Sequence, residues 1–202
     1  MVLIEGQLGG TEAMHDILFD VALRYTGNGI RVVFFRKTRV ERVSDYIRNQ
    51  FSGLGELFKM IIFMYVPTVE GALKRIMDLQ SWENCIPGLL IFESFDLLGT
   101  ERPVEPAAAN EEAMISRRTL LLSALADTVR TISVKNKRTC NCIVTTSGSS
   151  PEAIPYAMFF QQYNVLQAAD ILSSSDILKV MTEMQSTINQ QFEQESSCDK
   201  GI

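Results

Sequence analysis

Short apolar runs and amphipathic segments alternate along the first half of the chain. Unbroken apolar runs are typical of strands that are buried on both faces. Apolar residues spaced three and four positions apart are typical of helices with one buried face. The alternation from residue 1 to residue 93 therefore predicts an α/β fold with a mainly parallel central sheet flanked by helices. We expect strands at Met1–Glu5, Ile30–Phe35, Met60–Val66, Leu89–Phe92, Thr139–Thr146 and Ala168–Leu172.

The helical segments have the same clear periodicity. We expect helices at Glu12–Tyr25, Val40–Gln50, from Thr68 as N-cap to Met77, at Glu111–Val134, and at Ile177–Phe192. The last helix carries one apolar stripe, which leaves two interpretations open. Either it packs onto the core, or it offers a methionine-rich face to another chain. The stripe consists of Ile177, Met181, Met184, Ile188 and Phe192. We divide the chain into a core domain at 1–175, this helix at 176–192, and a disordered tail at 193–202.

An acid closes the central apolar strand, in the segment Pro87–Leu98 (PGLLIFESFDLL). In P-loop NTPases the acid at this position, here Glu93, holds Mg²⁺. The glycine-rich segment Gly6–Ala13 (GQLGGTEA) lies between a strand and a helix, where a P-loop lies. The P-loop lysine has no counterpart, and Glu12 stands close to where phosphates would lie. Since a carboxylate repels a polyphosphate, we expect a degenerate nucleotide site and no ATP hydrolysis by this chain.

Composition excludes some classes of function. The chain has 202 residues and a net charge of −5, which argues against a dedicated nucleic-acid binder but not against a local basic patch. No apolar run reaches the length of a membrane span, so we expect no membrane partner. The four cysteines and the lone His15 do not form a zinc set. We expect reduced thiols, no metal site, and His15 on the surface or flank of its helix.

A basic cluster follows the second strand. It is either a solvated face or a contact with DNA phosphates or an acidic partner. Its members are Arg36, Lys37, Arg39, Arg42 and Arg48. Arg117 and Arg118 are expected to face away from the core. The cations after the long helix, Lys135, Lys137 and Arg138, are expected from the helix dipole alone.

Several segments resemble the RecA/recombinase family over residues 1–172. They are Tyr65–Ile76 (YVPTVEGALKRI) ahead of the Glu93 strand, the long helix followed by CNCIVTTSG, and Phe159–Leu172 (FFQQYNVLQAADIL). The chain is similar in particular to the small, diverged recombinase paralogues of Shu-type complexes. These include the worm partner of a recombinase paralogue and the vertebrate partner of a SWIM-domain protein.

The resemblance implies a RecA-like P-loop NTPase core, a nuclear location and a role in homologous recombination. It implies a non-catalytic mediator that pairs with another recombinase paralogue, or with a SWIM-domain protein. The pair stabilises or remodels recombinase filaments, and any contact with single-stranded DNA runs through the partner. Gly6, Gly9, Gly10 and Thr11 match the Walker A loop and Glu93 the Walker B acid.

The missing lysine implies no cofactor of the chain's own, with ATP and Mg²⁺ bound only through a partner's site. We expect the partner interface at Glu93, Asp96 and the Gly6–Thr11 loop, together with Ile177, Met181, Met184 and Ile188. An alternative is a RecA-like subunit of the Elongator complex, which supports transfer-RNA modification. Elongator subunits share the sheet and lack Walker motifs, but the match at Val66–Ile76 fits them less well.

Overall fold

A computed structural model gives the structure of the chain. It describes residues 1–6, 11–51, 53–98, 107–147, 156–160, 165–171, 173–184 and 186. The segment 187–202, including Ile188, lies outside the described residues, as do Gly9, Gly10 and residues 99–106. The sequence predicts a loop over Gly99–Asn110, and this prediction was wrong from Ala107 on, where a helix begins.

The core of the protein is a six-stranded sheet in the order β3-β2-β4-β5-β1-β6. Every neighbouring pair of strands is parallel. The predicted fold class, α/β with a mainly parallel sheet flanked by helices, is therefore confirmed. The strands are β1 (Val2–Glu5), β2 (Val32–Arg36), β3 (Ile61–Tyr65), β4 (Leu89–Phe92), β5 (Asn141–Thr145) and β6 (Val165–Gln167).

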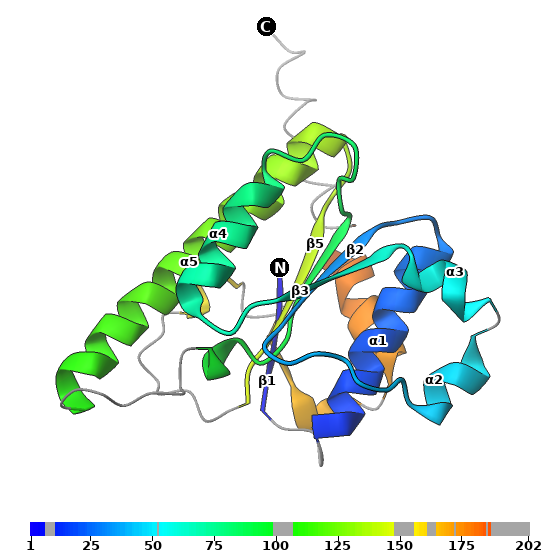
Figure 1. Cartoon of the computed structure of the whole chain (residues 1–202), viewed down its shortest axis with the longest axis horizontal. Coiled ribbons are helices and arrows are strands. Elements are labelled where there is room, and N and C mark those ends of the chain that lie inside the picture. Colours follow the sequence, from blue (N-terminus) through cyan, green and yellow to red (C-terminus); the bar gives the residue numbers. More distant parts are fainter. Residues whose placement is uncertain are drawn as a thin grey trace, which may run out of the picture.

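Helices cover both faces of this sheet, as Figure 1 shows. α4 (Val69–Leu79) and α5 (Ala107–Asn136) lie together on one face. α1 (Thr11–Gly27), α2 (Asp45–Gln50) and α3 (Leu54–Phe58) lie on the other. Short 3₁₀ helices are η1 (Phe95–Leu97), η2 (Tyr156–Met158) and η4 (Ala168–Asp170), and residues 174–184 form a further helix.

Alternation along the strands divides the core into two layers, because successive side chains of a strand point to opposite faces. Phe35, Leu90 and Val144 pack with Ile76 of α4 and Leu122 of α5. Their immediate neighbours in the strands pack on the other layer. That layer joins Phe34, Ile91 and Ile143 to Leu18 of α1 and to Met181 of the helix at 174–184.

Side-chain caps determine where two helices begin. Thr68 Oγ1 accepts from Gly71 N at 3.1 Å, which confirms the predicted N-cap of α4. Ser44 Oγ accepts from Ile47 N at 3.3 Å, so α2 begins at Asp45. The prediction of a helix from Val40 was wrong, because this cap places residues 40–44 outside the helix.

The sixth strand also differs from the prediction. β6 begins at Val165 and ends at Gln167, where the chain turns into η4. The prediction of a strand over Ala168–Leu172 was therefore wrong for its described residues, because Ala168–Asp170 form a 3₁₀ helix. Ala168 and Ile171 fill the core at this helix and directly after it, and Leu172 lies outside the described residues. Ala168 and Ile171 are each 1% exposed.

The helix at 174–184 belongs to the core of this chain. Ile177 is 0%, Met181 1% and Met184 6% exposed, all in the layer that α1 covers. The prediction that these three residues form an interface with a partner needs correction, since their apolar stripe is already covered. The helix begins at residue 174, inside the range 1–175 that was predicted for the core domain. It packs in the same layer as β1 and α1 and therefore belongs to that domain.

Candidate functional site

The carboxyl ends of the strands meet at one edge of the sheet, which we call the carboxyl edge. It consists of the residues that follow β1, β2, β4 and β5. Ligands bind at this edge in open α/β sheets. Glu93 follows β4, and its backbone N donates to Phe35 O of β2 at 3.1 Å. Glu93 therefore has the position in the fold that the sequence predicts for a Walker B acid.

The Glu93 carboxylate is held by two side chains of its own chain. Arg36 Nε lies 2.6 Å from Glu93 Oε2, as an ion pair whose angle is not that of a directed hydrogen bond. His15 Nδ1 lies 3.2 Å from Glu93 Oε1. Arg36 Nη1 lies 3.2 Å from His15 Nε2, which closes a three-membered cluster. The exposed fractions of the three side chains are 12% for Arg36, 19% for His15 and 14% for Glu93.

This geometry assigns the tautomer of His15. A guanidinium has only donors, so Nε2 must accept from Arg36. The proton of the neutral ring is then on Nδ1, which donates to Glu93. Both oxygens of Glu93 thus face positive or donor groups, and Arg36 supplies the charge that a cation would otherwise supply.

Local packing orients His15. Its ring lies edge-on to Phe19, one turn further along α1, with the ring centroids 4.4 Å apart. It also lies edge-on to Phe34 of β2 at 6.3 Å. Of the two predicted positions for His15, the surface was wrong and the flank of the helix fits, because the half-buried ring packs against core aromatics and reaches the sheet edge. The only sequence signal was the spacing of His15 and Phe19, which are neighbours on one helix face.

A second carboxylate, Asp96, secures the turn that follows Glu93. It is 3% exposed, and both of its oxygens accept from Ser147 N at 2.9 Å. Ser147 Oγ also donates to it. Ser94 has a φ of +52° in the same turn, and its N donates to Thr145 Oγ1 at 2.9 Å. The predicted role of Asp96 at a partner surface needs correction, because this carboxylate joins η1 to the end of β5.

Arg118 completes this arrangement from α5. It is 5% exposed and donates to the carbonyl oxygens of Leu98, at 3.1 Å, and of Asp96. Burial lowers the pKa of its guanidinium, an effect that the charge of Asp96 opposes. Arg118 thus points inward, contrary to the prediction. Its neighbour Arg117 points outward and pairs with Glu70 at 3.1 Å.

The predicted basic cluster separates into one half-buried member, Arg36, and several members nearer the surface. Arg36 pairs with Glu93, so the prediction that it contacts an external anion was wrong. Lys37 Nζ contacts Leu97 O at 3.5 Å. Arg39 lies over the Tyr65 ring at 5.9 Å, and Arg42 pairs with Asp45 at 3.5 Å. For Lys37, Arg39 and Arg42, contact with an anion stays a prediction.

The glycine-rich loop begins with a backbone that suits glycine. Gly6 has a φ of +99°, a region that other residues rarely adopt, and a Cβ there would meet Ala168 at 3.7 Å. Thr11 is the first residue of α1. Among the described residues, no group of three His, Cys, Asp or Glu side chains is placed to hold a metal ion. In the part of the chain that the structure describes, no helix is long and apolar enough to cross a membrane.

Comparisons with known proteins give likenesses in fold alone. No family model matches the chain, and no curated protein matches it. Among solved structures it is similar to the RadB recombinase, with a TM-score of 0.46 and 14% identity over 72% of this chain and 60% of the recombinase chain. It is also similar to a DnaB-like replicative helicase, with a TM-score of 0.35 and 12% identity over 72% of this chain and 38% of the helicase chain.

Proposed function

We propose that the chain is a non-catalytic, RecA-like subunit that acts in homologous recombination in the nucleus. It pairs with another recombinase paralogue or a SWIM-domain protein, and the pair stabilises or remodels recombinase filaments on single-stranded DNA. The observation that carries the non-catalytic part of this proposal is the pairing of Glu93 with Arg36 and His15.

A carboxylate that holds Mg²⁺ must present an oxygen to the ion and its waters. Here Arg36 and His15 occupy that side of Glu93 at 2.6 and 3.2 Å. Binding a metal would require Arg36 to move and leave its half-buried charge without a partner, which is costly. The cluster therefore favours a Glu93 that stabilises the sheet edge over one that takes part in phosphoryl transfer.

The sequence of the neighbouring loop supports the same proposal. It lacks the lysine that neutralises phosphates and carries Glu12 instead. ATP and Mg²⁺ are then bound by the partner, with this chain as a supporting surface. The outward-facing cations at the carboxyl edge, Lys37, Arg39 and Arg42, are the residues we propose for contact with an acidic surface of the partner or with DNA phosphates.

The partner is best identified by co-purification. We expect the tagged full chain to recover a recombinase paralogue or a SWIM-domain protein from nuclear extract, identified by mass spectrometry. Recovery of Elongator subunits instead would overturn the recombination role. A titration of the isolated chain with Mg-ATP tests the non-catalytic part, and we expect no binding and no turnover. Turnover that Glu93→Gln abolishes would show that the chain is an ATPase.

A further inference from the structure

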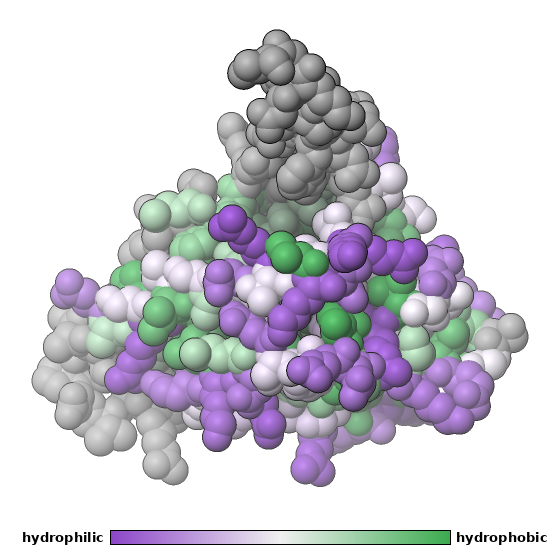
Figure 2. All heavy atoms as spheres, turned by 90° about the horizontal axis from the view of Figure 1, so that it is seen from above, coloured by the Kyte–Doolittle hydropathy of each residue, from purple (hydrophilic) through white to green (hydrophobic). Residues whose placement is uncertain are grey.

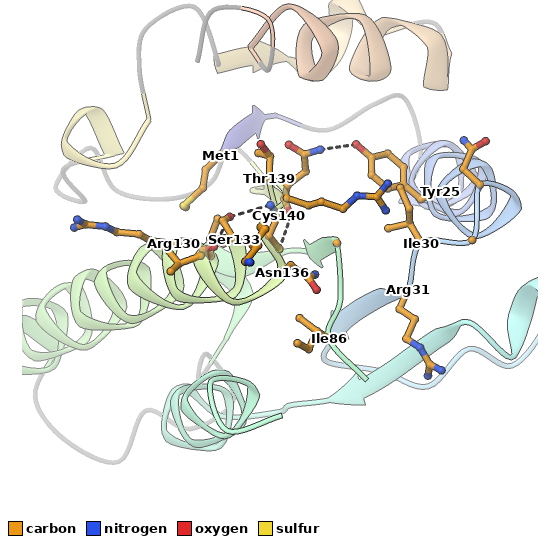
Figure 3. Close-up of a pocket in the computed structure, with 18 of the residues that line it drawn as sticks. Met1, Tyr25, Ile30, Arg31, Ile86, Arg130, Ser133, Asn136, Thr139 and Cys140 are labelled. Atoms are coloured by element: carbon orange, nitrogen blue, oxygen red, sulfur yellow. Dashed lines mark hydrogen bonds between the residues drawn. The ribbon is translucent and has the colours of Figure 1, made fainter. Parts of the chain in front are cut away.

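A broad hollow opens at the edge of the sheet opposite Glu93, where the strands begin, which we call the amino edge. Its volume is about 1160 Å³. It lies between the end of α1, the start of β2, the segment before β4 and the last turns of α5, as Figure 3 shows. Small-molecule pockets measure about 300–1,000 Å³, so this open hollow is at least as large as a typical one and has room for an extended ligand.

Cations predominate in its lining. Arg31, Arg130, Lys137 and Arg138 line it, and Glu83 is the one acid among the described lining residues. Among the residues that the structure describes, none of these four cations has an ion-pair partner. Arg31 donates to Cys85 Sγ at 3.2 Å. A chain with a net charge of −5 thus has a surface of local positive charge.

The helix dipole explains only part of this cluster. Lys137 and Arg138 follow α5, where positive charge is favourable. Arg130 lies more than one turn before the end of that helix, and Arg31 precedes β2. Figure 3 shows Arg130 and Arg31 on opposite sides of the hollow, with their guanidinium groups extending away from each other, so the positive charge lies at two sides of its rim. Figure 2, which looks down on this edge, shows hydrophilic side chains gathered around its middle.

Hydrogen bonds hold in place the backbone segments that carry these cations. Cys140 N donates to Ser133 Oγ at 2.9 Å, which holds the turn between α5 and β5. Gly88 N donates to Arg31 O, and Asn141 N to Gly88 O, both at 2.9 Å. The cations therefore project from a rigid frame, which reduces the entropy lost when a ligand binds.

The lining suits a phosphate backbone. Three of the four cations are arginines, whose planar fork binds phosphate oxygens two at a time. Asn28, Asn84 and Asn136 add amides that can both donate to and accept from sugars and base edges. Cations on two sides of the hollow, together with these amides, fit an extended phosphate chain better than a single anion.

We propose that this hollow binds the sugar-phosphate backbone of single-stranded nucleic acid. The contact is made by this chain directly, at the amino edge, and it does not depend on the proposed pairing with a paralogue. Because phosphate contacts dominate, binding is weakly selective for sequence and weakens steeply as salt rises.

The experiment compares two variants with the same change in charge. In one, Arg130→Glu, Lys137→Glu and Arg138→Glu reverse three cations of the hollow. In the matched control, Lys74→Glu, Arg75→Glu and Lys179→Glu reverse three exposed cations of α4 and of the helix at 174–184. Fluorescence anisotropy measures the binding of a labelled single-stranded oligonucleotide to the full chain at low and physiological salt.

We expect the hollow variant to lose affinity about tenfold or more and to show a shallower salt dependence than the parent and the control. Equal losses in both variants, or no binding by the parent, would overturn the proposal. So would an affinity for polyglutamate that equals that for the oligonucleotide, since the hollow would then be a peptide site. If circular dichroism shows that the triple variant is unfolded, Arg130→Ala with Arg138→Ala replaces it, with a smaller expected loss.

Discussion

The two edges of the sheet differ in how their charged side chains are buried and paired. At the carboxyl edge the described acids Glu93 and Asp96 are half-buried or buried, and each contacts donors of its own chain. At the amino edge, cations such as Arg130 and Arg138 are exposed and have no ion-pair partner among the described residues. The two carboxylates at the first edge therefore stabilise the fold, whereas the cations at the second remain available for a ligand.

This difference shows that a residue can have the position of a ligand-binding group in the fold without the free side chain that binding needs. Parallel sheets place ligands at the carboxyl edge, and Glu93 has that position. Its contacts with Arg36 and His15 nevertheless resemble a structural ion pair. The comparison predicts that substitution of the carboxyl-edge acids Glu93 and Asp96 changes stability, and that reversal of the amino-edge cations changes binding.

The largest effect is expected for Asp96→Ala. It removes a buried carboxylate that accepts from Ser147 and leaves donors of the turn without partners. We expect a loss of about 3 kcal/mol in the free energy of unfolding, measured by urea denaturation. Asp127→Ala is the control, since its bond from Gln80 is exposed, and it should cost less than about 0.5 kcal/mol. Equal effects of the two substitutions would contradict the structural role of Asp96.

Glu93→Gln should have the next largest effect. It leaves the half-buried Arg36 without its counter-charge, so we expect a loss of about 2 kcal/mol in the absence of any ligand. Glu56→Gln removes a carboxylate from an exposed pair with Lys59 and should change stability by less than about 0.5 kcal/mol. A more stable Glu93→Gln protein would show that the carboxylate is strained, as expected of a residue kept for a metal.

Tyr25→Phe should have the smallest effect on the free energy of unfolding at neutral pH. It tests the hydrogen bond of a residue that lines the hollow. Tyr25 OH accepts from Asn141 Nδ2 at 2.7 Å, so at neutral pH its removal should cost about 1 kcal/mol. Burial raises the pKa of Tyr25 to about 12 from its usual value of 10.0. Between these values the unfolded chain binds fewer protons than the folded chain. Tyr25 should therefore contribute a loss of up to about 2 kcal/mol of stability to the parent protein as pH rises from 10 to 12.

The Phe variant should lack the part of the alkaline decline that comes from Tyr25. The part that comes from Cys140 and Cys142 should remain, because burial also raises the pKa of these thiols. Tyr46→Phe, at a side chain that is 57% exposed, is the matched control and should retain both parts. If Tyr25→Phe and the parent protein decline equally, Tyr25 is not buried as the structure has it.

The sequence predicted features that depend on local patterns. Apolar runs marked most of the strands, Thr68 marked a helix start, and the run before Glu93 marked a buried strand. Contacts between segments that are distant in the sequence could not be predicted from these local patterns. His15 and Glu93 are 78 positions apart, and they meet because α1 crosses the sheet near β2 and β4. Arg118 was equally hidden, because a charged residue is assigned to the surface until its buried carbonyl partners are known.

The helix at 174–184 shows a different limit. Its apolar stripe fits burial against its own domain or against a partner equally well, since both remove the same area from water. Which of the two occurs depends on whether the core layer that α1 covers has apolar surface left for the helix, and the sequence does not reveal this. Met181 and Ile177 fill that surface beside α1.

The strand order also has a consequence for how the chain is made. β1 lies between β5 and β6, and Leu3 pairs with both Val144 and Val165. Among the six strands of this sheet, the first to leave the ribosome thus has no neighbour until nearly the whole sheet has been synthesised. Such non-local pairing slows folding and leaves an apolar strand exposed in the nascent chain. We therefore expect ribosome-bound intermediates of this protein to depend on chaperones until β5 and β6 have emerged.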